Sequence, residues 1–214
     1  MVSKATKQNE IFTEPKRVDP NTLRNLGPLR KMAGVWEGRK GKDVNPKAKG
    51  PERNDFVERY SLQPIDPQLN GPQLLYGLRY FTFICEPDDT AMFHEQVGYW
   101  LWEPATQTVM HTLAIPRGQI AMATGKVKPR ARQFSLASRR ASLSNGIVSG
   151  VFLEENFTTL AWDIEVTIHD DTSWSYAQDT QLLVKGRDTI FHHTDRNTLR
   201  KISEPTPNPS ALKK

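Results

Sequence analysis

The chain has 214 residues, and 37% of them are Ala, Val, Ile, Leu, Met, Phe, Trp, Tyr or Cys. Adding the 13 glycines gives roughly 43%, slightly below the 45–50% of an average globular domain. The formal net charge of +5 is too small to indicate a nucleic-acid-binding protein. No apolar run approaches the roughly 18 residues of a membrane span, and the first residues lack the apolar core of a signal peptide. We therefore expect one cytoplasmic domain whose partner is neither a nucleic acid nor a membrane.

The cysteine content limits the chemistry further. Cys85 is the single cysteine of the sequence, which excludes an intramolecular disulfide, a cysteine-based zinc site and a C-x-x-C-H haem attachment motif. Any metal or cofactor must therefore be held by histidines, by carboxylates or by the shape of a pocket.

Composition predicts the domain boundaries. Residues 1–20 and 205–214 are rich in proline and polar residues, so we expect two disordered tails around a single domain at 21–204. At the start of this domain, Leu23, Leu26 and Leu29 recur every three residues and predict a short helix. The Gly27-Pro28 pair interrupts that helix.

The rest of the domain predicts β-strands. Aromatic and β-branched residues dominate segments 74–84, 93–102 and 109–115, and strict alternation of apolar and polar residues runs through 162–168 and 174–184. Pro- and Gly-rich turns separate these segments, which gives about eight to ten strands. This pattern is typical of an antiparallel barrel or a sandwich, and a barrel of that size holds one small ligand.

Three of the five histidines are candidates for the chemistry. His94 alternates in phase with Trp100, so it is either a hydrogen-bonded core or rim residue or a pocket residue beside the tryptophan. His192 and His193 are adjacent, and adjacent strand residues point to opposite faces, so only one of them can face a barrel interior. A neutral imidazole is a good ligand for haem iron or a divalent metal.

Three stretches carry a resemblance to a known family. The opening Gly34-Val35-Trp36-Glu37-Gly38, the run from Phe93 to Tyr99 and the segment from His192 to Leu199 resemble the nitrobindin family, over about residues 26–202. The resemblance implies an all-β fold, a roughly ten-stranded antiparallel barrel of the lipocalin or fatty-acid-binding type with a short N-terminal helix. It also implies haem b as the cofactor and a histidine of the last strand as the iron ligand.

The resemblance assigns roles residue by residue. It makes His193 the ligand of the haem iron, with His192 as the alternative, and it places His94 and Trp36 at the cofactor; Trp100 joins them through its shared face with His94. Family members bind nitric oxide at ferric haem and are implicated in isomerising peroxynitrite to nitrate. The resemblance thus implies a haem-dependent peroxynitrite isomerase. It leaves the oligomeric state open, and a dimer is among the alternatives.

Two alternatives stay open. The barrel could bind a fatty acid or another small hydrophobic ligand without catalysis, with Arg79 or Arg117 facing a carboxylate, or its own aromatic side chains could fill it. The chain also departs from the family pattern in two places. Arg39 and Lys40 interrupt the glycines of the opening motif and could narrow the mouth, and one extra residue follows the paired histidines.

Overall fold

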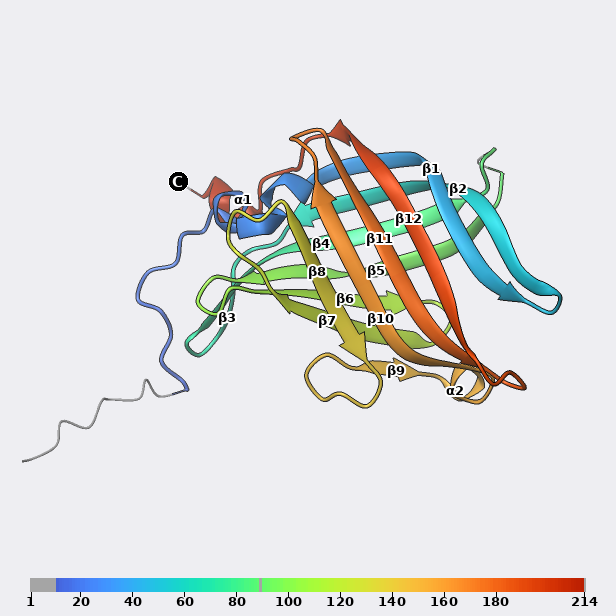
Figure 1. Cartoon of the computed structure of the whole chain (residues 1–214). Coiled ribbons are helices and arrows are strands. Elements are labelled where there is room, and N and C mark those ends of the chain that lie inside the picture. Colours follow the sequence, from blue (N-terminus) through green and yellow to red (C-terminus); the bar gives the residue numbers. More distant parts are fainter. Residues whose placement is uncertain (1–10, 89, 214) are drawn as a thin grey trace, which may run out of the picture.

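The computed structural model describes residues 11–88 and 90–213, so half of the expected N-terminal tail, residues 1–10, lies outside the described part. Strands dominate the chain (Figure 1). In the described residues, no helix has the length and apolar character needed to cross a membrane. The elements are, in order, α1 (Thr22–Asn25), η1 (Gly27–Met32), β1 (Gly34–Lys47), β2 (Gly50–Pro64), β3 (Gln68–Asn70), β4 (Gln73–Cys85), β5 (Met92–Glu103), β6 (Thr108–Ile115), β7 (Gln119–Lys126), β8 (Gln133–Arg139), β9 (Ile147–Ser149), α2 (Val151–Asn156), β10 (Phe157–Ile168), β11 (Ser173–Val184), β12 (Ile190–Ser203) and η2 (Pro209–Leu212).

Ten of the strands close into an antiparallel barrel. The ring runs β2-β1-β12-β11-β10-β8-β7-β6-β5-β4, and pairing between β2 and β4 closes it. The pairing between β7 and β8 is the shortest in the ring, with the single register pair Thr124 and Ala137. Beside it, β9 pairs with β7. The predicted all-β barrel is confirmed, and closure removes the free sheet edges that a sandwich would leave.

Aromatic side chains form a connected group in the barrel interior. Trp36 and Trp174 meet edge to face with ring centroids 6.1 Å apart, and Tyr60 contacts Trp174 at 5.6 Å and Tyr80 at 5.2 Å. These rings are almost completely buried. They come from the alternate positions that the strand period turns inward, so the alternation seen in the sequence is the alternation between core and solvent.

One end of the barrel is closed by the α1–η1 segment and by η2 near the C-terminus, and this closure is called the plug below (Figure 1). Leu26, Leu29 and Met32 of the α1–η1 segment are fully buried in the core. The segment expected as a C-terminal tail packs beside them, because the buried Asn208 accepts a hydrogen bond from the Thr22 N–H (3.1 Å) and donates one to the Pro20 carbonyl (2.8 Å). These bonds tie residues 205–212 to the plug despite their proline content.

The opposite end is formed by the turns between β1 and β2, β4 and β5, β6 and β7, and β11 and β12 (Figure 1). This end, called the open end below, is where interior side chains become polar and partly exposed. It therefore positions the candidate site.

Candidate ligand site at the open end of the barrel

The last strand decides which of the paired histidines faces inward. On β12, Leu199 is fully buried and Asn197 is 4% exposed, so the alternate residues Asp195 and His193 lie on the inner face. His192 takes the opposite face, where its side chain is 57% exposed. The structure thus places His193 inside the barrel and His192 outside it.

His193 forms an ion pair with a carboxylate of the neighbouring strand β1. Its Nε2 lies 2.8 Å from Asp43 Oδ1, and the Asp43 side chain is only 11% exposed. Burial lowers the pKa of His193, but the hydrogen bond to Asp43 and the charges of Asp195 and Asp43 outweigh it, so the pKa lies above its usual value. The pair therefore favours a protonated imidazole.

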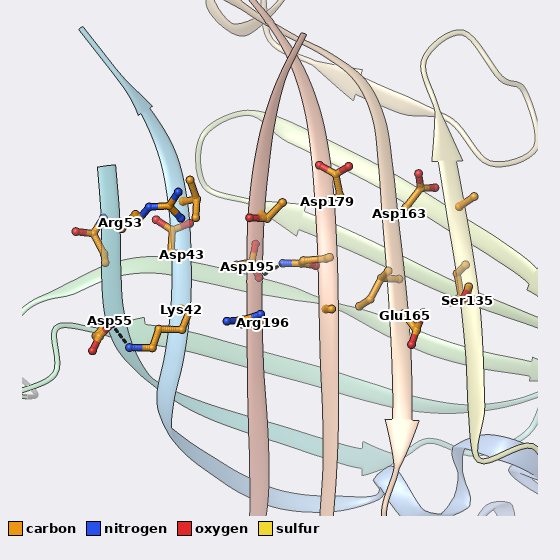
Figure 2. Close-up of a pocket in the computed structure, with 18 of the residues that line it drawn as sticks. Lys42, Asp43, Arg53, Asp55, Ser135, Asp163, Glu165, Asp179, Asp195 and Arg196 are labelled. Carbon is orange, nitrogen blue, oxygen red and sulfur yellow. Dashed lines mark hydrogen bonds and ion pairs between the residues drawn. The ribbon is translucent and has the colours of Figure 1, made fainter. Parts of the chain in front are cut away.

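Asp195 adds a second carboxylate to this cluster. Gln178 Nε2 donates a hydrogen bond to Asp195 Oδ1 at 2.5 Å, and Trp162 Nε1 donates to Gln178 Oε1 at 3.1 Å. Burial raises the pKa of Asp195 to about 7, against the opposing effect of His193. One ligand atom each from Asp43, His193 and Asp195 lies within 4.8 Å of the others, and Asp43 on β1 and Asp195 on β12 occupy neighbouring strands (Figure 2).

His94 projects from β5 on the inner face that also carries Gln96 and the buried Trp100. Burial and then the Arg117 charge lower its pKa to about 4, while the charges of His193 and Asp43 also act on it. His94 is therefore neutral at pH 7, and it belongs to the same electrostatic neighbourhood as the cluster. Arg117, in the turn after β6, donates a hydrogen bond to the Phe93 carbonyl at 3.2 Å.

Deeper in the barrel, a buried carboxylate is surrounded by donors. Glu58 is 2% exposed and accepts hydrogen bonds from Tyr176 (2.8 Å), Thr82 (3.0 Å) and Asn197 (3.2 Å). Burial raises its pKa although all three bonds lower it. A cavity of about 30 Å³ lies between Glu58, His94 and His111, and it has room for water molecules rather than for a drug-sized ligand.

A larger hollow, of about 840 Å³, crosses β2, β1, β12, β11, β10 and β8 (Figure 2). Lys42, Arg196, Ala177, Glu165 and Ser135 are register partners on successive strands and alternate with core residues, so this row lies on the outer face. Asp43, Gln178 and Asp195 of the inner cluster also border the hollow. Charges of both signs line it. This lining does not suit an apolar ligand, and we place the candidate site at the open end instead.

The remaining residues singled out from the sequence lie outside the cluster of Asp43, His193 and Asp195. Trp36 and Trp100 are core residues: Trp36 Nε1 donates to the Met32 carbonyl at 2.7 Å, and the Trp100 ring stacks on His111 at 3.7 Å. Arg79 points outward beside the exposed Tyr99.

The two charges that interrupt the glycine motif, Arg39 and Lys40, are exposed, so they do not narrow the barrel. They sit where the register of β1 with β2 shifts, between Gly38 and Gly41. Gly41 packs so closely that an added Cβ would lie 2.2 Å from the Phe56 ring. Arg39 and Lys40 are thus accommodated by a bulge in β1.

The sequence pattern did not identify two residues of the cluster around His193. Asp195 lies two positions after His193 and shares its face, a signal that strand periodicity carries. Asp43 offers no local signal, because only the register of β1 with β12 brings it opposite Asp195.

The architecture defines the class of small, closed ten-stranded antiparallel β-barrels, here closed by short helices at one end and polar at the other. The model of the "THAP4-like, heme-binding beta-barrel domain" matches residues 25–201. The chain belongs to this family, which confirms the resemblance to nitrobindins.

Solved structures agree on the fold. The crystal structure of Rv2717c from M. tuberculosis superposes with a TM-score of 0.58, covering 84% of this chain and 96% of that one at 22% sequence identity. Comparison with curated proteins finds no match.

Proposed function

We propose that this chain binds haem b at the open end of its barrel, with His193 as the ligand of the iron. The observation that carries the proposal is the inward orientation of His193 on the last strand, combined with membership of a haem-binding family. His192, the alternative, lies on the outer face and is held by Asp179 at 2.7 Å.

The donor chemistry around His193 fits an iron centre. Histidines that bind metals generally hydrogen-bond a carboxylate or carbonyl through their second ring nitrogen, which fixes the ring and raises its basicity. Asp43 supplies this carboxylate to Nε2, and iron binding at the other ring nitrogen, Nδ1, would require the protonated imidazole to release the proton of that nitrogen. Because the interior cavity that Glu58, His94 and His111 line measures about 30 Å³, too small for a porphyrin, we place the ligand site at the mouth of the barrel rather than deep within it.

The proposal extends to peroxynitrite isomerase activity. Ferric haem bound at the site would supply a Lewis-acidic iron that reacts with peroxynitrite or nitric oxide. The protein's own contribution is a neutral His94 and the positive charge of Arg117, which lies close enough to His94 and His193 to act on both. A positive charge at the mouth favours the approach of an anionic substrate.

The test is a titration of the untagged protein with hemin, followed by its Soret absorption. We expect a saturable Soret shift for the wild type, loss of that shift in His193→Ala, and an unchanged shift in His192→Ala. An unshifted Soret band in the wild type, or an unchanged one in His193→Ala, would overturn the proposal. Peroxynitrite decay in the presence of the loaded wild type and His193→Ala then tests the activity.

A second candidate is non-enzymatic binding of a small apolar carboxylate. The observation that favours it is Arg117, which lies at the open end, whereas Arg79 points away. Displacement of a fluorescent fatty acid by unlabelled fatty acid, with Arg117→Gln as the comparison, separates this function from haem binding. The filled core predicts that long acyl chains bind weakly, because their burial needs several hundred Å³.

A further inference from the structure

We propose that Asp43, His193 and Asp195 form a site for a divalent transition-metal ion, independent of porphyrin. The three residues come from the adjacent strands β1 and β12, and Asp43 and Asp195 are register partners. One ligand atom from each lies within 4.8 Å of the others. The inference concerns the same histidine as the proposed function but does not require haem.

The spacing of these atoms suits coordination. Two ligands that each lie about 2.0–2.2 Å from one metal ion are at most about 4.4 Å apart, so the cluster needs only a small closure. The distance of 2.8 Å from His193 Nε2 to Asp43 Oδ1 is already that of two neighbouring ligands. A metal ion at this place takes the position of the proton that the two atoms now share.

The surroundings hold the ligands in place. The chain of hydrogen bonds from Trp162 through Gln178 to Asp195 fixes one carboxylate, as the outer partners of metal ligands usually do. The clustering of two carboxylates at a partly buried position favours a cation, while the charge of Arg117, which acts on His193, opposes it.

A further donor lies in the same electrostatic neighbourhood as the cluster. His94 is inside the barrel, and the charges of both His193 and Asp43 act on it. A neutral imidazole there can complete a coordination shell that the three core ligands leave open.

The donor set selects the kind of metal. One imidazole nitrogen with two carboxylates suits Fe²⁺, Mn²⁺, Co²⁺ or Zn²⁺, while Mg²⁺ and Ca²⁺ prefer oxygen ligands alone. Adding His94 would give two histidines and two carboxylates, a mixed nitrogen and oxygen set that also suits a transition metal. We infer a transition-metal site rather than a magnesium or calcium site.

The experiment titrates the untagged, metal-free protein with Co²⁺, followed by visible absorption, and with Zn²⁺ by calorimetry. We expect one ion per chain, and affinities at least 10-fold lower in Asp43→Asn and in Asp195→Asn. The matched control is Asp179→Asn, which removes a carboxylate that pairs with the neighbouring His192 on the outer face. This control should bind within 2-fold of the wild type, and Mg²⁺ should give no comparable heat.

The outcomes separate this inference from haem binding. Near-wild-type binding in both inner variants, or loss of binding in Asp179→Asn, would overturn the metal site, whatever hemin does. Near-ultraviolet circular dichroism of each variant identifies a folding defect, and an inner variant that stays folded decides the result. A missing Soret shift with intact Co²⁺ binding would overturn the haem proposal alone.

Discussion

Two adjacent histidines of β12 each pair with an aspartate of a neighbouring strand, one on the outer and one on the inner face of the barrel. His192 meets Asp179 at 2.7 Å on the outer surface, and His193 meets Asp43 at 2.8 Å on the inner face. The hydrogen bonds are equally short, but the His192 ring is 57% exposed and the His193 ring 34%. Because exclusion of water strengthens electrostatic interactions, only the inner pair, with Asp195 beside it, becomes a candidate site.

The two faces of β12 differ most in solvent exposure where the strand passes the hydrophobic core. Leu199 is fully buried, whereas its neighbour Thr198 is exposed. We expect Leu199→Ala to lower the free energy of unfolding by about 2–5 kcal/mol through lost contacts and a cavity, and Thr198→Ala to change it by at most about 0.5 kcal/mol. Urea unfolding followed by tryptophan fluorescence measures both, and equal losses would contradict the assigned faces.

A smaller effect is expected at the buried Glu58. The Tyr176 hydroxyl donates to it at 2.8 Å in the interior, while the nearby Ser175 hydroxyl pairs with His169 at the surface. Tyr176→Phe leaves the carboxyl group short of one donor and should cost about 1–3 kcal/mol, the penalty of an unsatisfied buried polar group. Ser175→Ala is the control, and a comparable loss there would show that burial does not set the cost.

Much of the fold could be predicted from the sequence, because it is local. Alternation at 162–168 and 174–184 predicted strands, and the structure has β10 and β11 there, with Trp162 and Trp174 inside. Gly27 interrupted the helix as expected, since it adopts φ of +55° at a position where a Cβ would lie 2.5 Å from the Trp102 ring. The barrel rather than the sandwich came from the family resemblance.

The site could be predicted only in part, because it depends on register. Periodicity placed one of two adjacent histidines inward but could not choose, since the choice depends on where β12 is anchored by Leu199. Asp43 is 150 residues from His193 in sequence, and no local pattern predicts that contact. Residue type also does not reveal whether an acidic side chain is buried. The sequence gives Glu58 and Asp195 no mark that separates them from surface acids, yet burial raises the pKa of both carboxyl groups.

The inner face also predicts a pH dependence. Burial raises the pKa of Glu58 above its ordinary value of 4.5, so the folded protein binds more protons than the unfolded chain once the pH exceeds that value. Stability from this group is therefore full below pH 4.5 and is lost as the pH rises through the folded pKa. The advantage of wild type over Glu58→Gln should shrink with rising pH by up to about 1.4 kcal/mol per unit, measured by urea unfolding between pH 4.5 and 8. A difference that stays constant over this range would contradict the raised pKa.

The smallest effect is expected for the outer pair, and it closes the comparison with the inner one. An exposed ion pair gains little because water screens it and two side chains must be ordered, so His192→Ala and Asp179→Asn should each change stability by at most about 0.5 kcal/mol. Asp43→Asn, in contrast, weakens a hydrogen bond between charged groups at a partly buried position and should cost about 1.5–3 kcal/mol. Urea unfolding at pH 6 with and without 1 M NaCl measures these changes. The salt shortens the screening length to roughly 3 Å, so it should reduce the stability change of the outer variants further and leave that of Asp43→Asn unaltered. Equal salt sensitivity at the two pairs would show that the face of the strand does not distinguish them.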